Sequence, residues 1–165
     1  MHERFQWAEK ILSVKPRDEI LEIGCGSGLL LNILAGQITT GKIVAIDKSA
    51  KMLSSARKRN SEFIDAGKIE LIEAAFPLTL SGKFDKVIAF NVSAFWSDNG
   101  KSLAGLKGLL KRKGRIYVFY QPPVEKAHQI AEEAIKFFES NGATILNVSF
   151  KRLRPASAFC IEAII

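Results

Sequence analysis

The sequence has little of what secreted, metal-binding or membrane-spanning proteins depend on. It contains two cysteines and two histidines among 165 residues. Cys25 and Cys160 make neither a disulfide framework nor a metal cluster, and a reducing cytoplasm is the simplest location for two such thiols. No apolar run is long enough to cross a bilayer, and the opening residues MHER have no signal-peptide character. We therefore expect a cytoplasmic protein with no metal site and no membrane partner.

What is present favours one compact domain with a basic surface. Hydrophobic residues make up 47% of the chain, which excludes a disordered protein, and we expect residues 1–165 to form a single domain. The formal net charge is +7, with basic residues concentrated at 51–59, 107–115 and 151–154. Such a charge can mark a nucleic-acid partner. No aromatic residues interleave with the basic runs, so we favour solvated helix faces and strand ends.

Residues 19–28 (EILEIGCGSG) join a short apolar strand to three alternate glycines. Because glycine lacks Cβ, such a loop turns tightly and lets a ligand approach the backbone. A helical pattern follows from Leu29, and a helix N-terminus offers free N–H groups. The spacing is neither the dinucleotide pattern G-x-G-x-x-G nor a P-loop. A tight turn without any ligand is the alternative interpretation.

A carboxylate is expected at the end of the next strand. Residues 42–47 (KIVAID) end in Asp47, which lies 19 residues after Gly28. An acid at the end of the second strand of a βαβ unit is placed to bind a ribose diol. The glycine turn and this acid together predict a nucleoside-cofactor site. We expect the loss of Asp47 to weaken cofactor binding with little effect on stability.

The rest of the chain alternates strands with helices. An opening helix is predicted at 3–13, strands at 19–24, 42–47, 69–73, 86–91 and 115–121, and further helices at 28–37, 49–60 and 101–111. This alternation predicts a parallel sheet with helices on both faces. After Pro122 and Pro123, apolar residues at helical spacing run from Val124 to Phe138, and His128 falls on or beside that face. Two closing strands are predicted at 143–153 and 157–165.

Residues 21–28 (LEIGCGSG) resemble the first motif of the class I, seven-stranded S-adenosylmethionine-dependent methyltransferases, and residues 44–53 (VAIDKSAKML) resemble its second. The resemblance continues through 82–91 and 109–118, in the family's order. It implies an α/β fold with one doubly wound, mostly parallel seven-stranded sheet of order 3-2-1-4-5-7-6, whose last strand is antiparallel. It also implies S-adenosyl-L-methionine as cofactor and S-adenosyl-L-homocysteine as product.

The resemblance also implies roles for individual residues. Asp47 would accept both ribose hydroxyls, and Glu22 would orient the loop or the cofactor ammonium, unless it is merely a strand-end charge. Asn91 would contact the methionine end. The methionine and ribose portion of the cofactor would lie over Gly24, Cys25, Gly26 and Gly28.

The adenine end departs from the family pattern. Many relatives carry Gly-Asp-Ala after the third strand, with the aspartate bound to adenine, but here Ala75 supplies no carboxylate. Adenine recognition then rests on backbone groups, on Glu73 or on packing against Phe76. Lys48 and Met52 would border the adenine, although Met52 could instead pack in the core.

The acceptor site is the least defined part of the sequence. Phe95 and Trp96 are expected to wall an apolar acceptor pocket, with Phe5 and Trp7 of the opening helix as a lid. The alternatives are that the first pair belongs to the core and that the second pair attaches the helix to the sheet. Residues 91–94 (NVSA) do not match the tetrapeptide of adenine or cytosine amino-methylating enzymes.

The sequence does not identify catalytic residues. Methyl transfer from a sulfonium mainly needs alignment of the reacting atoms, and a general base helps only when the acceptor is protonated. His2 is terminal and His128 is interpreted as structural. We expect a small-molecule acceptor. The alternatives are an RNA methyltransferase that uses the basic surface and a non-catalytic S-adenosylmethionine-binding protein.

Overall fold

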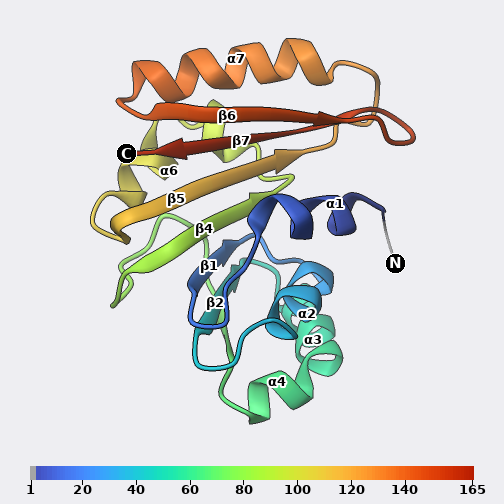
Figure 1. Cartoon of the computed structure of the whole chain (residues 1–165), viewed down its shortest axis with the longest axis vertical. Helices are drawn as coiled ribbons and strands as arrows, with labels where there is room; N and C mark the ends of the chain where they lie inside the picture. The colour runs from blue at the N-terminus through green and yellow to red at the C-terminus, as the bar shows by residue number, and fades with distance from the viewer. Residues whose placement is uncertain (1–2) are drawn as a thin grey trace.

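The computed structural model describes residues 3–165, which form one seven-stranded sheet flanked by helices (Figure 1). The strand order is β3-β2-β1-β4-β5-β7-β6, so the predicted order is confirmed. The first five strands are parallel, and β7 is antiparallel to both β5 and β6. The strands are β1 (Glu19–Ile23), β2 (Lys42–Asp47), β3 (Ile69–Glu73), β4 (Phe84–Phe90), β5 (Leu110–Tyr120), β6 (Thr144–Lys151) and β7 (Ala158–Ile164).

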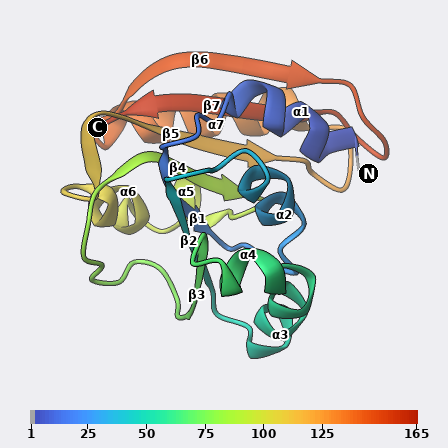
Figure 2. The ribbon, with the colours of Figure 1, turned by 60° about the horizontal axis from the view of Figure 1, so that its bottom comes forward.

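Helices cover both faces of the sheet, as predicted. The helices are α1 (Glu3–Leu12), α2 (Leu29–Ala35), α3 (Ala50–Arg59), α4 (Ser61–Asp65), α5 (Ala94–Ser97), α6 (Lys101–Leu106) and α7 (Ala127–Ser140). One hydrophobic cluster joins the sheet to α1, α2, α3 and α4, and the other joins it to α5, α6 and α7. In Figure 2, α6 lies on one side of the central strands, with α2 and α3 on the other. Adjacent residues of β1 divide between the clusters, since Ile20 packs in one and Leu21 in the other.

Some element boundaries differ from the sequence-based expectation. The helix predicted at 101–111 ends at Leu106, because Gly108 adopts a φ of +88° and Leu110 already pairs with Phe84 in β5. Val124 is 55% exposed and lies before α7, so it does not belong to the apolar face of that helix. The two short helices α4 and α5 were not predicted.

The topology fixes where a ligand can approach. Strand β1 pairs with both β2 and β4, and the chain leaves β1 and β4 toward opposite faces of the sheet, since α2 and α5 belong to different clusters. Where consecutive crossovers diverge in this way, a crevice opens at the carboxyl ends of the strands. The exits from these two strands are Gly24 and Asn91. The candidate site lies at this edge.

Candidate cofactor site

The glycine turn after β1 is held in a conformation that favours glycine. Gly24, Gly26 and Gly28 have φ values of +72°, +56° and +72°. A Cβ on Gly24 would lie 2.6 Å from Cγ2 of Val92, and one on Gly28 would lie 2.5 Å from Nδ2 of Asn60. At Gly26 a Cβ would meet no atom within 4 Å. Gly24 and Gly28 are therefore needed for packing, whereas Gly26 faces open space that a ligand can use.

Asp47 at the end of β2 organises this turn. Its Oδ2 accepts a hydrogen bond from the backbone N–H of Gly26 at 2.8 Å, and its Oδ1 accepts one from the backbone N–H of Ser49 at 2.9 Å. The carboxylate thus bridges the glycine turn and the start of α3. This differs from the expectation that Asp47 contributes little to stability. Each oxygen still has a lone pair for a ligand.

Glu22 lies beneath the same turn. It is 2% exposed, and its Oε2 is buried with no hydrogen-bond partner among residues 3–165. Burial, reinforced by the negative charge of Asp47, raises the pKa of Glu22 from 4.5 to about 8. An unpaired buried carboxylate oxygen is costly, and a cation or a hydrogen-bond donor on a ligand would satisfy it.

Arg4 of α1 belongs to the opening segment that the sequence places over the site, but the sequence assigns it no role of its own there. Its Nε is buried and has no hydrogen-bond partner in the described part of the chain. The guanidinium carbon lies 4.8 Å from the ring centroid of Phe5 and 5.6 Å from that of Phe90, within cation–π range. A cavity of about 170 Å³ lies between Arg4, Glu22 and the glycine turn. One arginine on an amphipathic helix has no sequence pattern that distinguishes it from a solvated charge.

A larger hollow of about 450 Å³ adjoins this cavity, because Gly24 and Asn91 line both. Most predicted cofactor residues are brought together here. The larger hollow is lined by Gly24, Asp47, Lys48, Ala75, Phe76 and Asn91, and the smaller one by Phe5, Glu22, Gly24, Cys25, Gly26 and Asn91. The two hollows lie side by side along the ends of β1, β2 and β4 and together make up the candidate site.

Met52 and Gly28 lie beside this site rather than in its walls. The Met52 side chain is 45% exposed, which does not fit the alternative of core packing, and its backbone N–H donates to Oγ of Ser49 at 3.3 Å. Gly28 packs against Ala56 of α3 and against Asn60, which caps the end of that helix. Gly28 therefore positions the turn through packing, and Met52 is available at the surface.

Asn91 links the cofactor site to the neighbouring strand. Its φ of +58° lies in the left-handed region, which asparagine tolerates better than most residues. Its Oδ1 accepts a hydrogen bond from the backbone N–H of Gln121 at 2.8 Å. This bond fixes the orientation of the Asn91 amide group, and its Nδ2 can donate a hydrogen bond to a ligand.

The aromatic residues expected in an acceptor pocket lie mainly in the core. Phe95 is 0% exposed and stacks on Phe76 at 6.3 Å, so its ring has no surface to offer a ligand. Trp96 packs edge-on against Tyr120 at 4.8 Å, and Trp7 packs edge-on against Phe119 at 5.5 Å. Phe5 alone among the four predicted pocket residues lines one of the two hollows of the site.

The cysteines and His128 have no place in the chemistry of the site. Burial raises the pKa of the Cys25 thiol well above its ordinary value, with Glu22 and Asp47 adding to the shift, so the thiolate is not accessible. His128 is exposed, follows the buried Ala127 of α7 and stacks on Phe150 at 4.0 Å, a packing contact outside the candidate site. The other histidine, His2, lies outside the described residues.

Comparison with known proteins identifies the family. Residues 21–116, more than half of the chain, match the family described as a methyltransferase domain. This chain belongs to the methyltransferase family. The match begins in β1 and ends in β5, so it contains the glycine turn, Asp47 and Asn91.

Relatives of this methyltransferase differ in length and named activity. The chain is 28% identical over 166 residues to the uncharacterized methyltransferase YdaC of Bacillus subtilis (strain 168), covering 96% of this chain and 89% of that protein. It is 32% identical over 104 residues to the malonyl-[acyl-carrier protein] O-methyltransferase of Acetivibrio thermocellus, covering 62% of this chain. The chain spans only 35% of the length of that second relative.

Solved structures with the same fold contain the cofactor that the sequence predicts. Magnesium protoporphyrin IX methyltransferase (ChlM) from Synechocystis PCC 6803, with bound SAM, matches with a TM-score of 0.75 and 22% identity over 97% of this chain and 78% of that one. This likeness shows the fold. No described helix of our methyltransferase combines the length and apolar character needed to cross a membrane.

A substitution at Gly26 tests whether the open space above the turn receives the cofactor. We expect Gly26→Ala to weaken S-adenosylhomocysteine binding about tenfold or more, because the added methyl group would occupy the space that the ligand needs. Gly67→Ala is a matched control, since Gly67 has a φ of +72° and also no atom within 4 Å of an added Cβ. Both variants should lose about 1 kcal/mol of stability from left-handed strain.

Calorimetry and thermal unfolding distinguish the two effects. Equal losses of stability with unequal losses of affinity would support a ligand above Gly26. If Gly26→Ala binds S-adenosylhomocysteine as well as Gly67→Ala does, the cofactor does not pass over this glycine.

Proposed function

We propose that this methyltransferase transfers the methyl group of S-adenosylmethionine to a small-molecule acceptor. The observation that carries the proposal is the buried, unpaired Oε2 of Glu22 beneath a glycine turn that opens onto free space at Gly26. An ammonium group on a bound molecule would satisfy that oxygen. The cofactor contains such a group on its methionine portion, so the residues present fit it.

The remaining residues fit the other parts of the cofactor. Asp47 has lone pairs for the ribose hydroxyls, and Arg4, which lines the small cavity, would bind the methionine carboxylate through its guanidinium. Lys48, Ala75 and Phe76 line the larger hollow, where the adenine would lie. Backbone groups and the Phe76 ring would then contact the base in place of an aspartate.

The protein's role in the reaction is to align the acceptor with the methyl group and exclude competing orientations. When bound, the cofactor supplies an electrophilic methyl group: the acceptor's lone pair forms the new bond to carbon, and the broken C–S pair remains on sulfur. A proton on the acceptor leaves to solvent. Asn91 and Arg4 both line the small cavity and would border the reacting atoms.

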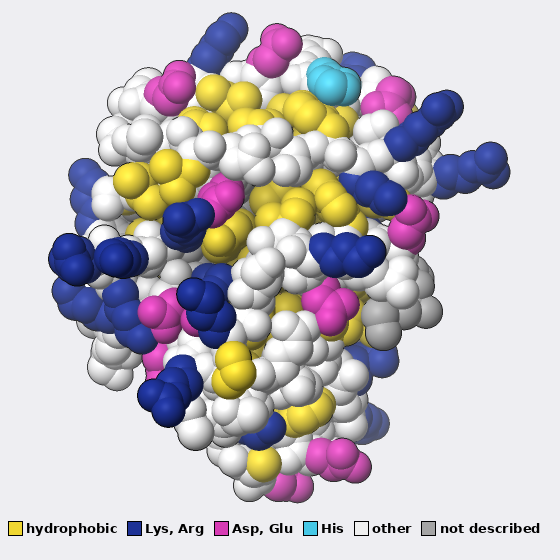
Figure 3. All heavy atoms as spheres, in the orientation of Figure 1, with side chains coloured by type: hydrophobic (Ala, Val, Ile, Leu, Met, Phe, Trp, Pro, Cys, Tyr) yellow, Lys and Arg dark blue, Asp and Glu magenta, His cyan; other side chains and the backbone are white. Residues whose placement is uncertain are grey.

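A small acceptor is favoured over RNA by the surface of the molecule. Figure 3 shows lysine and arginine side chains gathered at the left edge of the visible face and spread singly over the rest of it, with aspartate and glutamate between them. The net charge of +7 supports RNA as the second candidate acceptor. We place the activity in the cytoplasm, in keeping with two cysteines that are both free.

Calorimetric titration tests the cofactor assignment directly. We expect S-adenosylhomocysteine to bind with 1:1 stoichiometry and NAD to give no heat of binding, because the turn is G-x-G-x-G and the unpaired carboxylate of Glu22 requires a donor. Binding of NAD without binding of S-adenosylhomocysteine would overturn the proposal.

A further inference from the structure

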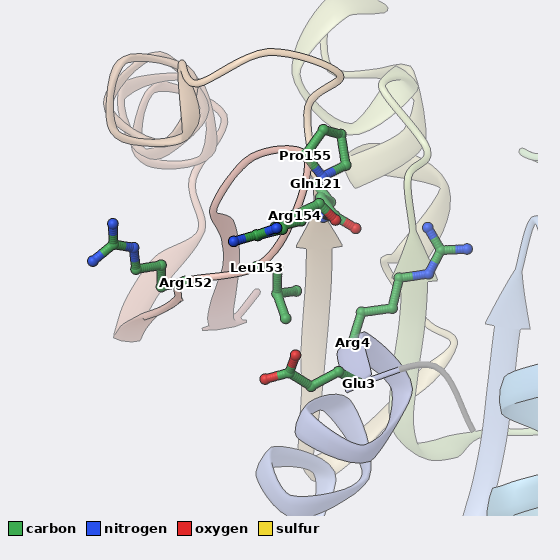
Figure 4. A pocket seen from close by; sticks show the side chains of 7 residues that line it. All are labelled: Glu3, Arg4, Gln121, Arg152, Leu153, Arg154 and Pro155. Carbon is green, nitrogen blue, oxygen red and sulfur yellow. Dashed lines mark hydrogen bonds between the residues drawn. The ribbon is translucent and has the colours of Figure 1, made fainter.

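A third hollow lies beside the cofactor site, between the start of α1 and the hairpin that joins β6 to β7 (Figure 4). Its volume is about 640 Å³, a size that suits a small organic molecule. Arg4 lines both this hollow and the small cavity above Glu22, so the two spaces lie on either side of its side chain. A molecule in this hollow would therefore lie next to the methionine end of a bound cofactor.

The walls of this hollow carry an excess of positive charge. Three of its seven lining residues are arginines, namely Arg4, Arg152 and Arg154. Glu3 is the one acidic residue in the lining, and its Oε1 is already paired with Nζ of Lys151 at 3.3 Å. Arg152 and Arg154 are exposed and form no ion pair with any residue in 3–165. Figure 4 shows the guanidinium groups of Arg152 and Arg4 directed away from the hollow, to opposite sides of it. Because the side chains of Arg152 and Arg154 are exposed and unpaired, they can turn inward to meet an anion.

The hairpin that carries these arginines is fixed to the sheet. Nε2 of Gln121 donates to the backbone oxygens of Arg154 and Ala156, each at 3.0 Å. The backbone N–H of Ser157 donates to Oε2 of Glu125 at 2.9 Å. Gln121 also donates its backbone N–H to Asn91, so one residue joins the hairpin to the edge of the cofactor site. The hairpin is thus positioned by the same strand end that positions Asn91.

We propose that the methyl acceptor carries an oxyanion, a carboxylate or phosphate group, and that Arg152 and Arg154 bind it in this hollow. The proposal rests on the methyltransferase function proposed above. A guanidinium binds a carboxylate or phosphate through two parallel hydrogen bonds, which orients as well as attracts it. With the anionic group at the hairpin, the remainder of the acceptor extends past Arg4 toward the transferable methyl group.

The composition of the hollow favours a compact anionic molecule over a phosphate chain. Leu153 projects between Arg152 and Arg4, and Pro155 closes the end near Gln121 (Figure 4). These apolar groups suit the carbon frame of a small acceptor.

Two-dimensional amide NMR on the full chain, with and without saturating S-adenosylhomocysteine, tests this inference. The probes are phenyl phosphate and benzoate, with neutral benzamide as the matched uncharged compound. We expect both anions, and not benzamide, to shift the backbone amide signals of Gln121 and of the non-proline hairpin residues Arg152, Leu153, Arg154, Ala156 and Ser157. In the variant Arg152→Gln/Arg154→Gln the affinity for phenyl phosphate should fall about tenfold or more.

The control removes two charges from the far end of the sheet. Arg112 and Lys113 are exposed at the start of β5, whereas Gln121 follows its end, so Arg112→Gln/Lys113→Gln should bind phenyl phosphate like the wild type. Equal shifts with benzamide, or undiminished affinity in the hairpin variant, would overturn the inference. Tighter binding of a ten-residue oligouridylate to the same amides would replace it with a nucleic-acid acceptor. Calorimetry with S-adenosylhomocysteine on the same samples reports separately on the proposed cofactor site.

Discussion

Asp47→Ala should weaken S-adenosylhomocysteine binding about 10- to 100-fold, since a hydrogen bond to a charged group contributes about 1.5–3 kcal/mol. Two effects combine in this loss. The proposed bonds to the ribose hydroxyls disappear, and the N–H of Gly26 loses the acceptor that holds it at 2.8 Å. The glycine turn is then less ordered before the ligand arrives, so the affinity also decreases through the cost of ordering it.

Two further variants separate the effects in this experiment. Asp47→Asn keeps one oxygen that can accept from Gly26 or Ser49, so its affinity should fall between those of the wild type and Asp47→Ala. Glu70→Ala is the control, because Glu70 pairs with Lys42 at 2.6 Å on the exposed surface, away from the turn. Calorimetry measures the affinity and thermal unfolding measures stability. An unchanged dissociation constant in Asp47→Ala would show that the ribose lies elsewhere.

The fold could be predicted because its signals are local and ordered along the chain. The motifs at 21–28 and 44–53 each combine a buried strand with the turn that follows it, and their order corresponds to one known sheet topology. The end of the helix that begins at Lys101 was harder to predict from the sequence. Its apolar pattern continues into β5, and the left-handed conformation of Gly108 together with the pairing of Leu110 with Phe84 decides where the helix ends and the strand begins.

The cofactor edge could be predicted for the same reason, whereas the acceptor side could not. Phe95 and Trp96 directly follow the strand that borders the site, but the short helix α5 turns both rings toward the core. Arg4 and Arg154 come from opposite ends of the sequence. They line the same hollow because α1 and the last hairpin pack at one edge of the sheet. The sequence pattern of neither segment predicts this packing.

The site also predicts an unusual dependence of stability on pH, caused by Glu22. Its pKa is raised from 4.5 to about 8 in the folded protein, so the folded state binds the proton more tightly than the unfolded chain. The contribution of Glu22 to the free energy of unfolding is therefore fully present below pH 4.5, where its carboxyl group is neutral in both states. It is lost as the pH rises toward 8, because the unfolded chain releases the proton and the folded protein still holds it. With about 1.4 kcal/mol for each pKa unit, the loss over this window is on the order of 4 kcal/mol.

Glu22→Gln should remove this loss, because the amide has a similar shape and no charge to bury. We expect the variant and the wild type to have similar unfolding free energies near pH 5, and the variant to be more stable at pH 8 by a few kcal/mol. Denaturant unfolding at both pH values measures the difference, with the exposed Glu70→Gln as the control for other titrating groups. The same substitution should weaken S-adenosylhomocysteine binding, since the proposed ammonium loses its carboxylate. Parallel pH profiles for Glu22→Gln and the wild type would show that Glu22 has an ordinary pKa, and undiminished binding would place the ammonium elsewhere.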